Sequence, residues 1–361
     1  MVLRRFAALG TAIAAAIGLN ACSVTGQLAS PNPNVSNARV FDYTAIAASD
    51  GVGVGSSKPC ATAPVVVGSD TEQMPSPVDC PGGKSYVPVI AGLLTVNRDS
   101  AVLTDLGISS AVVGPTERTL GNTWEPFVFG CTPSGLTACV PGDFVTDEVP
   151  LMPAQVNTVT IFAGGNDANA IFAHVAVACA SCTQQQVAAM IAADLTNFGN
   201  DYNTLLGEIH LAFPFARIYV ANLPNFGLIP RGVCIGSDPS NPPPFCDPVN
   251  DPAQGNPAAQ FLLDQITTAL DANVINGAIA AAGIPVIDLE CDPRSYDPAN
   301  FSADGFHPND AGYRTLAGSY AKAIRNFGAP PPAGSCGVFS QSGTRHPLRG
   351  INAKRLKMVR Y

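Results

Sequence analysis

Segments with the pattern of buried strands alternate along this chain with segments of helical periodicity, and this order constrains the fold more than any other feature. Short apolar or β-branched runs that predict strands occupy residues 41–47, 101–106, 156–163, 217–221 and 284–289. Strands separated by helices pair in parallel, and the helices cover both faces of the sheet. We therefore expect an α/β protein, a three-layer α/β/α sandwich around a central, mainly parallel sheet of about five strands.

Helical periodicity fills the intervals between these strands. The clearest case runs from residue 183 to about 212, where apolar side chains recur on one face. Further helices are expected at residues 87–96, 256–282 and 308–327. Because the C-terminal ends of parallel strands meet at one edge of a sheet, catalytic or binding side chains are expected in the loops at that edge.

Composition limits the classes of function. The chain has 361 residues, 47% of them apolar and only 13% charged, which permits a large buried core and is not the composition of a disordered chain. Nineteen Lys and Arg stand against 27 Asp and Glu, a formal net charge of −8. This balance excludes a nucleic-acid binder that acts through bulk charge.

The N-terminus reads as an export signal over residues 1–21. Arg4 and Arg5 precede an uncharged run, residues 6–19, that is too short to span a bilayer. The run ends in Leu-Asn-Ala-Cys, which resembles a bacterial lipobox and predicts lipid attachment at Cys22. An ordinary signal peptide with a spare thiol at Cys22 is the alternative. With lipidation the protein is exported and anchored to a membrane of the bacterial cell envelope, periplasmic or surface-exposed.

Three further stretches divide the exported chain. Residues 22–38 are rich in Ser, Asn and Pro and are expected to form a tether behind the lipid. Residues 39–336 form the folded body as a single domain. Residues 337–361 carry a cluster of Lys and Arg and are expected to be a solvated basic tail, rather than a contact with an anionic surface.

Ten of the 11 cysteines remain when Cys22 is set aside, an even number that suits an oxidising compartment. Pairing neighbours in sequence gives five candidate disulfides, although the sequence leaves the connectivity open: Cys60–Cys80, Cys131–Cys139, Cys179–Cys182, Cys234–Cys246 and Cys291–Cys336. The Cys-x-x-Cys at 179–182 has a rival interpretation as half a zinc site or a redox centre, but no second such motif accompanies it. We expect no metal.

Three polar motifs follow predicted strands or precede the last helix: Ser49, Asn166 and the pair Asp304 and His307. Together they have the parts that ester hydrolysis needs. A serine hydroxyl requires an imidazole to take its proton, and a carboxylate must orient that imidazole and stabilise its cation. Asp304 and His307 are three positions apart, so both side chains can point the same way on a tight turn. An amide such as that of Asn166 can donate to the developing oxyanion.

These motifs resemble those of the SGNH, or GDSL-type, serine hydrolase family of esterases and lipases. The segment around Ser49 is similar to the family's nucleophile block, Gly164-Gly165-Asn166-Asp167 to its Gly-x-Asn-Asp block, and Asp304-Gly-Phe-His307 to its Asp-x-x-His block. The resemblance implies a flavodoxin-like sheet, Ser49 as nucleophile, His307 as base and Asp304 as its partner. It also implies an oxyanion hole formed by Ser49, Ser110 and Asn166, with no cofactor.

Two positions depart from the family pattern. Ala47-Ala48 stands where the family has Gly-Asp before the serine, and Asp50 follows it instead. Ser110 replaces the glycine whose backbone N–H serves the oxyanion, so its Cβ narrows the site and demands an unusual backbone angle. Gly107 is the alternative donor. Asp50 is expected to cap the following helix rather than to take part in catalysis.

Each motif also has a purely structural explanation, as an N-cap, a loop that satisfies backbone donors or a polar pair at a helix start. Asp167 is expected to be structural. His174 and His210 lie in apolar helical segments without an evident partner and are expected to be packed or half-exposed histidines. Trp124 and Phe127 could line a pocket, although packing within their loop accounts for them equally well.

Two other classes compete with this interpretation. Ala47 to Gly51 also resembles the nucleophile elbow of some α/β-hydrolases, but that elbow follows several strands, whereas Ser49 follows the first. A binding lipoprotein on an inactive hydrolase scaffold is the second alternative. The expected substrate is an ester of a small molecule, a lipid or an acylated glycan. We expect no nucleic-acid partner, and we expect the protein to be a monomer.

Overall fold

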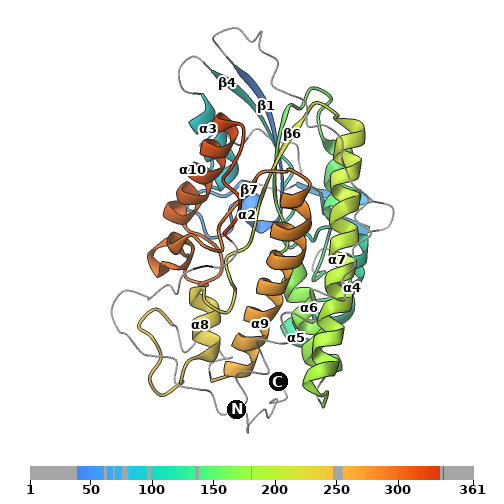
Figure 1. The fold of residues 1–361 in the computed structure, drawn as a ribbon, viewed down its shortest axis with the longest axis vertical. Helices are drawn as coiled ribbons and strands as arrows, with labels where there is room; N and C mark the ends of the chain where they lie inside the picture. Colours follow the sequence, from blue (N-terminus) through green and yellow to red (C-terminus); the bar gives the residue numbers. More distant parts are fainter. Residues whose placement is uncertain are drawn as a thin grey trace.

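A five-stranded parallel sheet forms the centre of the molecule (Figure 1). The computed structural model describes residues 39–336 apart from short gaps at 61–62, 68–69, 75–79, 81, 96–98, 135–137, 180, 247–254 and 334–335. The strand order is β4 (Ser100–Asp105), β1 (Val40–Ala47), β5 (Thr158–Phe162), β6 (Arg217–Ala221) and β7 (Val286–Ile287). The expected α/β class and mainly parallel sheet are confirmed.

Helices cover both faces of this sheet, which makes three layers (Figure 1). The α-helices are α2 (Ser49–Val52), α3 (Tyr86–Leu94), α4 (Pro115–Trp124), α5 (Pro126–Phe129), α6 (Gly165–Ala178), α7 (Gln184–Ala212), α8 (Pro230–Gly236), α9 (Pro257–Leu270) and α10 (Asp310–Asn326). Shorter or wider helical segments are η1 (Phe144–Glu148), η2 (Val149–Leu151), η3 (Asp271–Ile279), η4 (Pro293–Tyr296) and η5 (Pro298–Asn300).

Alternate residues of β1 face the two layers, as expected for a strand buried on both sides. Tyr43 and Ala45 belong to the core cluster formed with α3 and α10, whereas Ile46 belongs to the cluster formed with α6, α7 and α9. All three are at most 1% exposed. Because β1 lies between β4 and β5, the residues that follow it are surrounded by the ends of both neighbours.

The sequence predicted the long elements well and missed several short ones. The helix expected over residues 256–282 is α9 followed directly by η3, and the last predicted strand shortens to the two residues of β7. The sequence analysis did not identify α4, α5, α8 or η1, and it placed a helical segment around His174 without the bounds of α6. It also missed a small antiparallel hairpin of β2 (Ala63–Val67) and β3 (Asp70–Met74). The last two turns before α10, η4 and η5, carry Pro at their starts and were not predicted either.

All five disulfides obtained by pairing neighbouring cysteines are present: Cys60–Cys80, Cys131–Cys139, Cys179–Cys182, Cys234–Cys246 and Cys291–Cys336. The Cys179–Cys182 pair is therefore a disulfide rather than half a zinc site. Residues 1–38, with the signal segment, Cys22 and the tether, and residues 337–361 lie outside the described part of the chain. Among the residues described, no helix is both long and apolar enough to cross a membrane.

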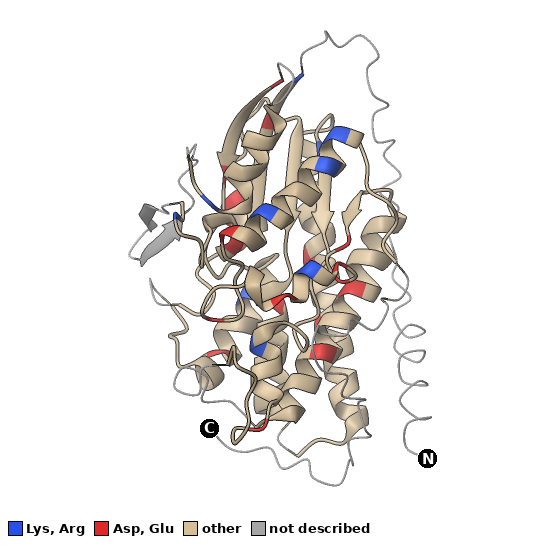
Figure 2. Cartoon of the chain, turned by 90° about the vertical axis from the view of Figure 1, so that its left-hand side faces the viewer, with Lys and Arg blue, Asp and Glu red and all other residues tan. Residues whose placement is uncertain are grey.

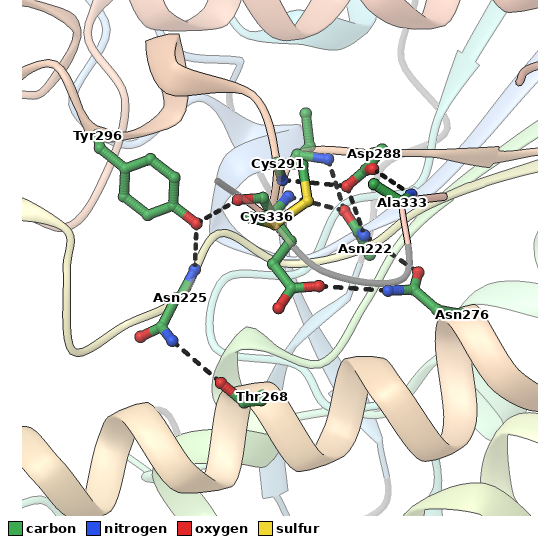
Figure 3. Close-up of a disulfide and its surroundings, with 11 residues drawn as sticks. Asn222, Asn225, Thr268, Asn276, Asp288, Cys291, Tyr296, Ala333 and Cys336 are labelled. Atoms are coloured by element: carbon green, nitrogen blue, oxygen red, sulfur yellow. Dashed lines mark hydrogen bonds between the residues drawn. A yellow bond between two sulfur atoms is a disulfide. The ribbon is translucent and has the colours of Figure 1, made fainter. Parts of the chain in front are cut away.

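Asn222 joins the loops that follow β6 and β7 (Figure 3). Its Nδ2 donates to Asp288 at 3.0 Å, and its Oδ1 accepts from the backbone N–H groups of Leu289 and Glu290. The Cys291–Cys336 disulfide lies beside this cluster and ties the segment after α10 to the same loop. These contacts fix the loops after β6 and β7 at the edge of the sheet where the strands end.

Two buried tyrosines test how much a single hydroxyl contributes to this core. The Tyr320 hydroxyl donates to the Ile161 carbonyl at 2.7 Å, whereas the equally buried Tyr202 hydroxyl has no hydrogen-bond partner among the described residues. We expect Tyr320→Phe to lower the free energy of unfolding by about 1–3 kcal/mol, because a buried acceptor loses its donor. Tyr202→Phe should be neutral or stabilising. Urea unfolding of both variants checks this, and equal losses would contradict it.

Candidate active site

Ser49 follows the C-terminal end of β1 and is the first residue of the single-turn helix α2. It is 7% exposed. Glycines make this tight turn possible: a Cβ on Gly51 would lie 2.6 Å from the Cβ of Ala47, and Gly53 ends the turn with φ +85°. The turn therefore presents Ser49 at the edge of the sheet where loops converge.

His307 and Asp304 approach Ser49 from the loop that precedes α10. His307 Nε2 lies 2.9 Å from Ser49 Oγ across 258 positions of sequence, and His307 Nδ1 lies 2.6 Å from Asp304 Oδ2. Gly305 between them has φ +65°, a left-handed conformation that turns both side chains to the same side. The structure thus brings together the three residues that the sequence analysis singled out, in the order serine, imidazole, carboxylate.

Asp304 is held as a carboxylate by its surroundings. Burial opposes its ionisation, but hydrogen bonds from the His307 ring, the Ser302 hydroxyl and the Phe306 N–H outweigh that effect and hold its pKa well below the ordinary value. The Ser302 bond is 2.6 Å long. A permanently charged carboxylate orients the imidazole and stabilises its cation.

Asn166 lines the same pocket as Ser49 and His307. Asn166 is the second residue of α6, and its Nδ2 donates to the Ala111 carbonyl at 2.8 Å, which leaves its second N–H for another acceptor. Ser110 adopts φ +64°, a left-handed conformation that glycine adopts without strain and other residues rarely adopt. The neighbouring Asp167 is buried and accepts from the Val113 N–H at 2.9 Å, in agreement with its expected structural role.

An apolar pocket opens beside Ser49 and His307. Phe226 lies over Gly165, where an added Cβ would approach its ring to 3.5 Å, and Phe306 packs edge-on against Phe226 with ring centroids 5.2 Å apart. Phe306 in turn packs edge-on against the His307 ring at 5.1 Å. Further lining residues are mostly apolar: Phe144, Phe162, Leu223, Ile229, Leu289 and Phe301. The reactive groups therefore face a cavity suited to a hydrocarbon chain.

Comparison with known families identifies the chain. Residues 78–315 match the model of the GDSL-like Lipase/Acylhydrolase family, about two thirds of the chain. This chain belongs to the GDSL-like lipase/acylhydrolase family. The match begins after Ser49, so the role of Ser49 as nucleophile stays a prediction from the motif order and from its distance to His307. No curated protein matches the sequence.

Solved structures similar to this GDSL-like hydrolase include a phospholipase A1 from Streptomyces albidoflavus, 15% identical with a TM-score of 0.44 over 79% of this chain and 98% of that one. An extracellular lipase from Streptomyces rimosus is 16% identical, with a TM-score of 0.44 over 78% and 99% of the two chains. A family 3 carbohydrate esterase from Clostridium thermocellum is 13% identical, with a TM-score of 0.38 over 80% and 97%. These likenesses assign neither substrate nor reaction to this chain.

Other residues singled out in the sequence lie away from this site. His174 has a partner that the sequence analysis did not foresee, because α7 brings Asp194 within 2.8 Å of its Nδ1, and Trp124 stacks on its ring. Trp124 and Phe127 are absent from the pocket lining. Among the described residues, the group with metal-ligating spacing is Glu125 with Cys131 and Cys139, whose sulfurs form a disulfide and are not thiolates.

Three acidic side chains lie beneath the nucleophile, and the sequence analysis named only Asp50 among them. Asp50, Asp105 and Glu148 each have a buried carboxyl oxygen with no hydrogen-bond partner among the described residues. Burial raises the pKa of Asp50 and of Asp105 to about 7 and that of Glu148 well above its ordinary value. Repulsion by Asp50 adds to the effect at Asp105, and repulsion by Asp105 and Asp50 adds to it at Glu148. Asp50 lies inside α2 and is not its N-cap, which is Ala48. No local motif marks these positions as neighbours.

Replacing one of these acids should remove a pH-dependent loss of stability. Because the folded pKa of Asp105 is about 7 and its ordinary value is 3.8, the folded state holds more protons between these values, and stability falls as the pH rises through them. Asp105→Asn keeps the acceptor for the Gly107 N–H and cannot ionise. We expect the stability of this variant relative to wild type to rise by about 2 kcal/mol from pH 5 to pH 8.

Urea unfolding at both pH values measures this difference. Glu208→Gln, which changes an exposed carboxylate on α7, is the matched control and should show the same relative stability at both pH values. A pH-independent difference for Asp105→Asn would contradict the interpretation of the buried carboxyls.

Proposed function

We propose that this GDSL-like hydrolase is a serine esterase or lipase that cleaves carboxylic ester bonds through an acyl-enzyme on Ser49. The observation that carries the proposal is the hydrogen-bonded chain from Ser49 through His307 to Asp304. Its distances of 2.9 and 2.6 Å are those that a nucleophile, a general base and an orienting carboxylate require.

In the proposed acylation step, Ser49 Oγ attacks the ester carbonyl while His307 Nε2 takes its proton. The carbonyl oxygen becomes an oxyanion, and Asn166 with the backbone N–H groups of Ser49 and Ser110 donates to it. His307 then protonates the leaving alcohol, so the ester C–O bond breaks and the acyl group remains on Ser49. Water repeats the sequence with His307 as base, which releases the carboxylic acid and restores the Ser49 hydroxyl.

The lining of the pocket favours an acyl chain longer than acetyl. Phe226 and Phe306 form an aromatic wall that begins at the His307 ring, and Phe144 lies on η1 beside the same cavity. Each buried methylene contributes about 0.8 kcal/mol when it leaves water. Lipids and acylated glycans both remain within the proposed class of substrates, since the pocket selects the acyl part rather than the alcohol.

The alternative of a non-catalytic envelope or carbohydrate-binding lipoprotein does not account for two features of the site. A binding protein needs no imidazole between a serine and a carboxylate, and it needs no strained left-handed backbone at Ser110.

We also propose export to the bacterial cell envelope with a lipid anchor at Cys22. The five disulfides support an oxidising compartment for this protein.

Hydrolysis of nitrophenyl esters by the oxidised protein tests the function. We expect Ser49→Ala to lose activity by at least about a thousandfold, because the acyl-enzyme cannot form. Ser319→Ala, on the half-buried outer part of α10, is the matched control and should retain it. We expect kcat/KM to rise from acetate to octanoate. Full activity of Ser49→Ala would refute the nucleophile, and an inactive but folded wild type would favour the binding lipoprotein.

A further inference from the structure

Glu148 occupies an unusual place beneath the nucleophile. It is the last residue of η1, it is fully buried, and its Oε2 accepts a hydrogen bond from the Ala47 N–H at 3.1 Å. Strand β4 has already ended at Asp105, whose partner on β1 is Ala45. The Glu148 carboxyl therefore supplies an acceptor to β1 at the point where its neighbouring strand no longer provides one.

The same carboxyl reaches the loop that carries Ser110. The Ile108 N–H donates to the Ala47 carbonyl at 3.2 Å, and the same N–H lies close enough to the Glu148 carboxyl to lower its pKa against the effect of burial. Ala47 is two residues before Ser49, and Ile108 is two residues before Ser110. One side chain thus contacts both segments whose backbone N–H groups are proposed to bind the oxyanion.

The segment around Glu148 is itself firmly held. Arg118 Nη1 lies 3.2 Å from Asp147 Oδ2, and its Nη2 donates to the Pro141 carbonyl. The Phe144 N–H donates to the Val112 carbonyl at 3.0 Å, which joins η1 to the end of the Ser110 loop. A carboxyl presented from so constrained a segment can set the position of the strands that it contacts.

We propose that Glu148 is a positioning residue that holds the end of β1 and the Ser110 loop in register, so that the two backbone donors of the oxyanion hole point to one place. Its kinetic consequence rests on the proposed function. Glu148 touches neither substrate nor the reacting atoms and acts through Ala47 and Ile108. It lies outside every motif by which the sequence resembles the family.

The chemistry of the carboxyl suggests the variants to compare. Burial, together with the neighbouring Asp105 and Asp50, raises the pKa of Glu148 well above its ordinary value and so favours its uncharged form. Glutamine has the same shape and the same acceptor oxygen without a charge. Leucine fills a similar volume and accepts nothing, which leaves the Ala47 N–H unpaired.

Steady-state kinetics on a nitrophenyl ester is the first measurement. We expect Glu148→Leu to lower kcat by roughly tenfold to a hundredfold with little change in KM, because a misplaced donor stabilises the transition state less than the bound ester. Glu148→Gln should retain kcat within about threefold. Glu117→Leu is the matched control: Glu117 is equally buried, but neither of its carboxyl oxygens has a hydrogen-bond partner among the described residues, so kcat should persist.

Hydrogen exchange at the Ala47 and Ile108 amides gives a readout that does not require activity. We expect faster exchange in Glu148→Leu and unchanged exchange in Glu148→Gln and Glu117→Leu. Unchanged exchange in Glu148→Leu would overturn the inference, as would a wild-type kcat in that variant or an equal loss in Glu148→Gln. If the wild type proved inactive, the proposed function would fail while exchange still decided whether Glu148 holds these amides.

Discussion

Parallel pairing of β1 with β4 on one side and β5 on the other is the constraint on which the site depends. It places the residues after three strands at one edge of the sheet: Ser49 after β1, the Ser110 loop after β4, and Asn166 after β5. The hydrogen bond from His307 to Ser49 then closes this edge from a loop 258 positions further along the chain. None of these groups could meet in an antiparallel meander, because its strand ends alternate between opposite edges.

This arrangement buries carboxyl groups beneath the nucleophile, where their ionisation is unfavourable. Asp105, Asp50 and Glu148 lie where the β1 turn, the end of β4 and η1 converge. Asp50 raises the pKa of Asp105, and both raise the pKa of Glu148. Their acceptor oxygens satisfy backbone N–H groups that the ending strands leave unpaired. Charged groups elsewhere on the described body are sparse, and Figure 2 shows Lys and Arg dispersed over the helices in that view rather than gathered on one face. The site is thus held by polar contacts in the interior of the protein.

The sequence predicted the architecture because long apolar strands and helices carry a strong periodic signal, and it predicted the Ser49, Asp304 and His307 trio because the family motifs are local. The five disulfides also followed from sequence neighbours. What it could not predict depends on distant contacts. His174 finds Asp194 only once α6 and α7 pack together, and Glu148 meets Ala47 across 101 positions. The seven-residue helix α8 is too short to show a hydrophobic periodicity. Phe226 and Phe306 lie far apart in the sequence and come together only in the folded protein.

The central claim is that Ser49 is an activated nucleophile, and covalent labelling by a fluorophosphonate tests it most directly. The folded, oxidised protein should gain one adduct, and peptide mapping by mass spectrometry should place it on Ser49. Heat-unfolded protein should gain none, because an isolated serine lacks the imidazole and the oxyanion donors that make it reactive. Absence of an adduct on the folded protein, or an adduct on a different serine, would contradict the account.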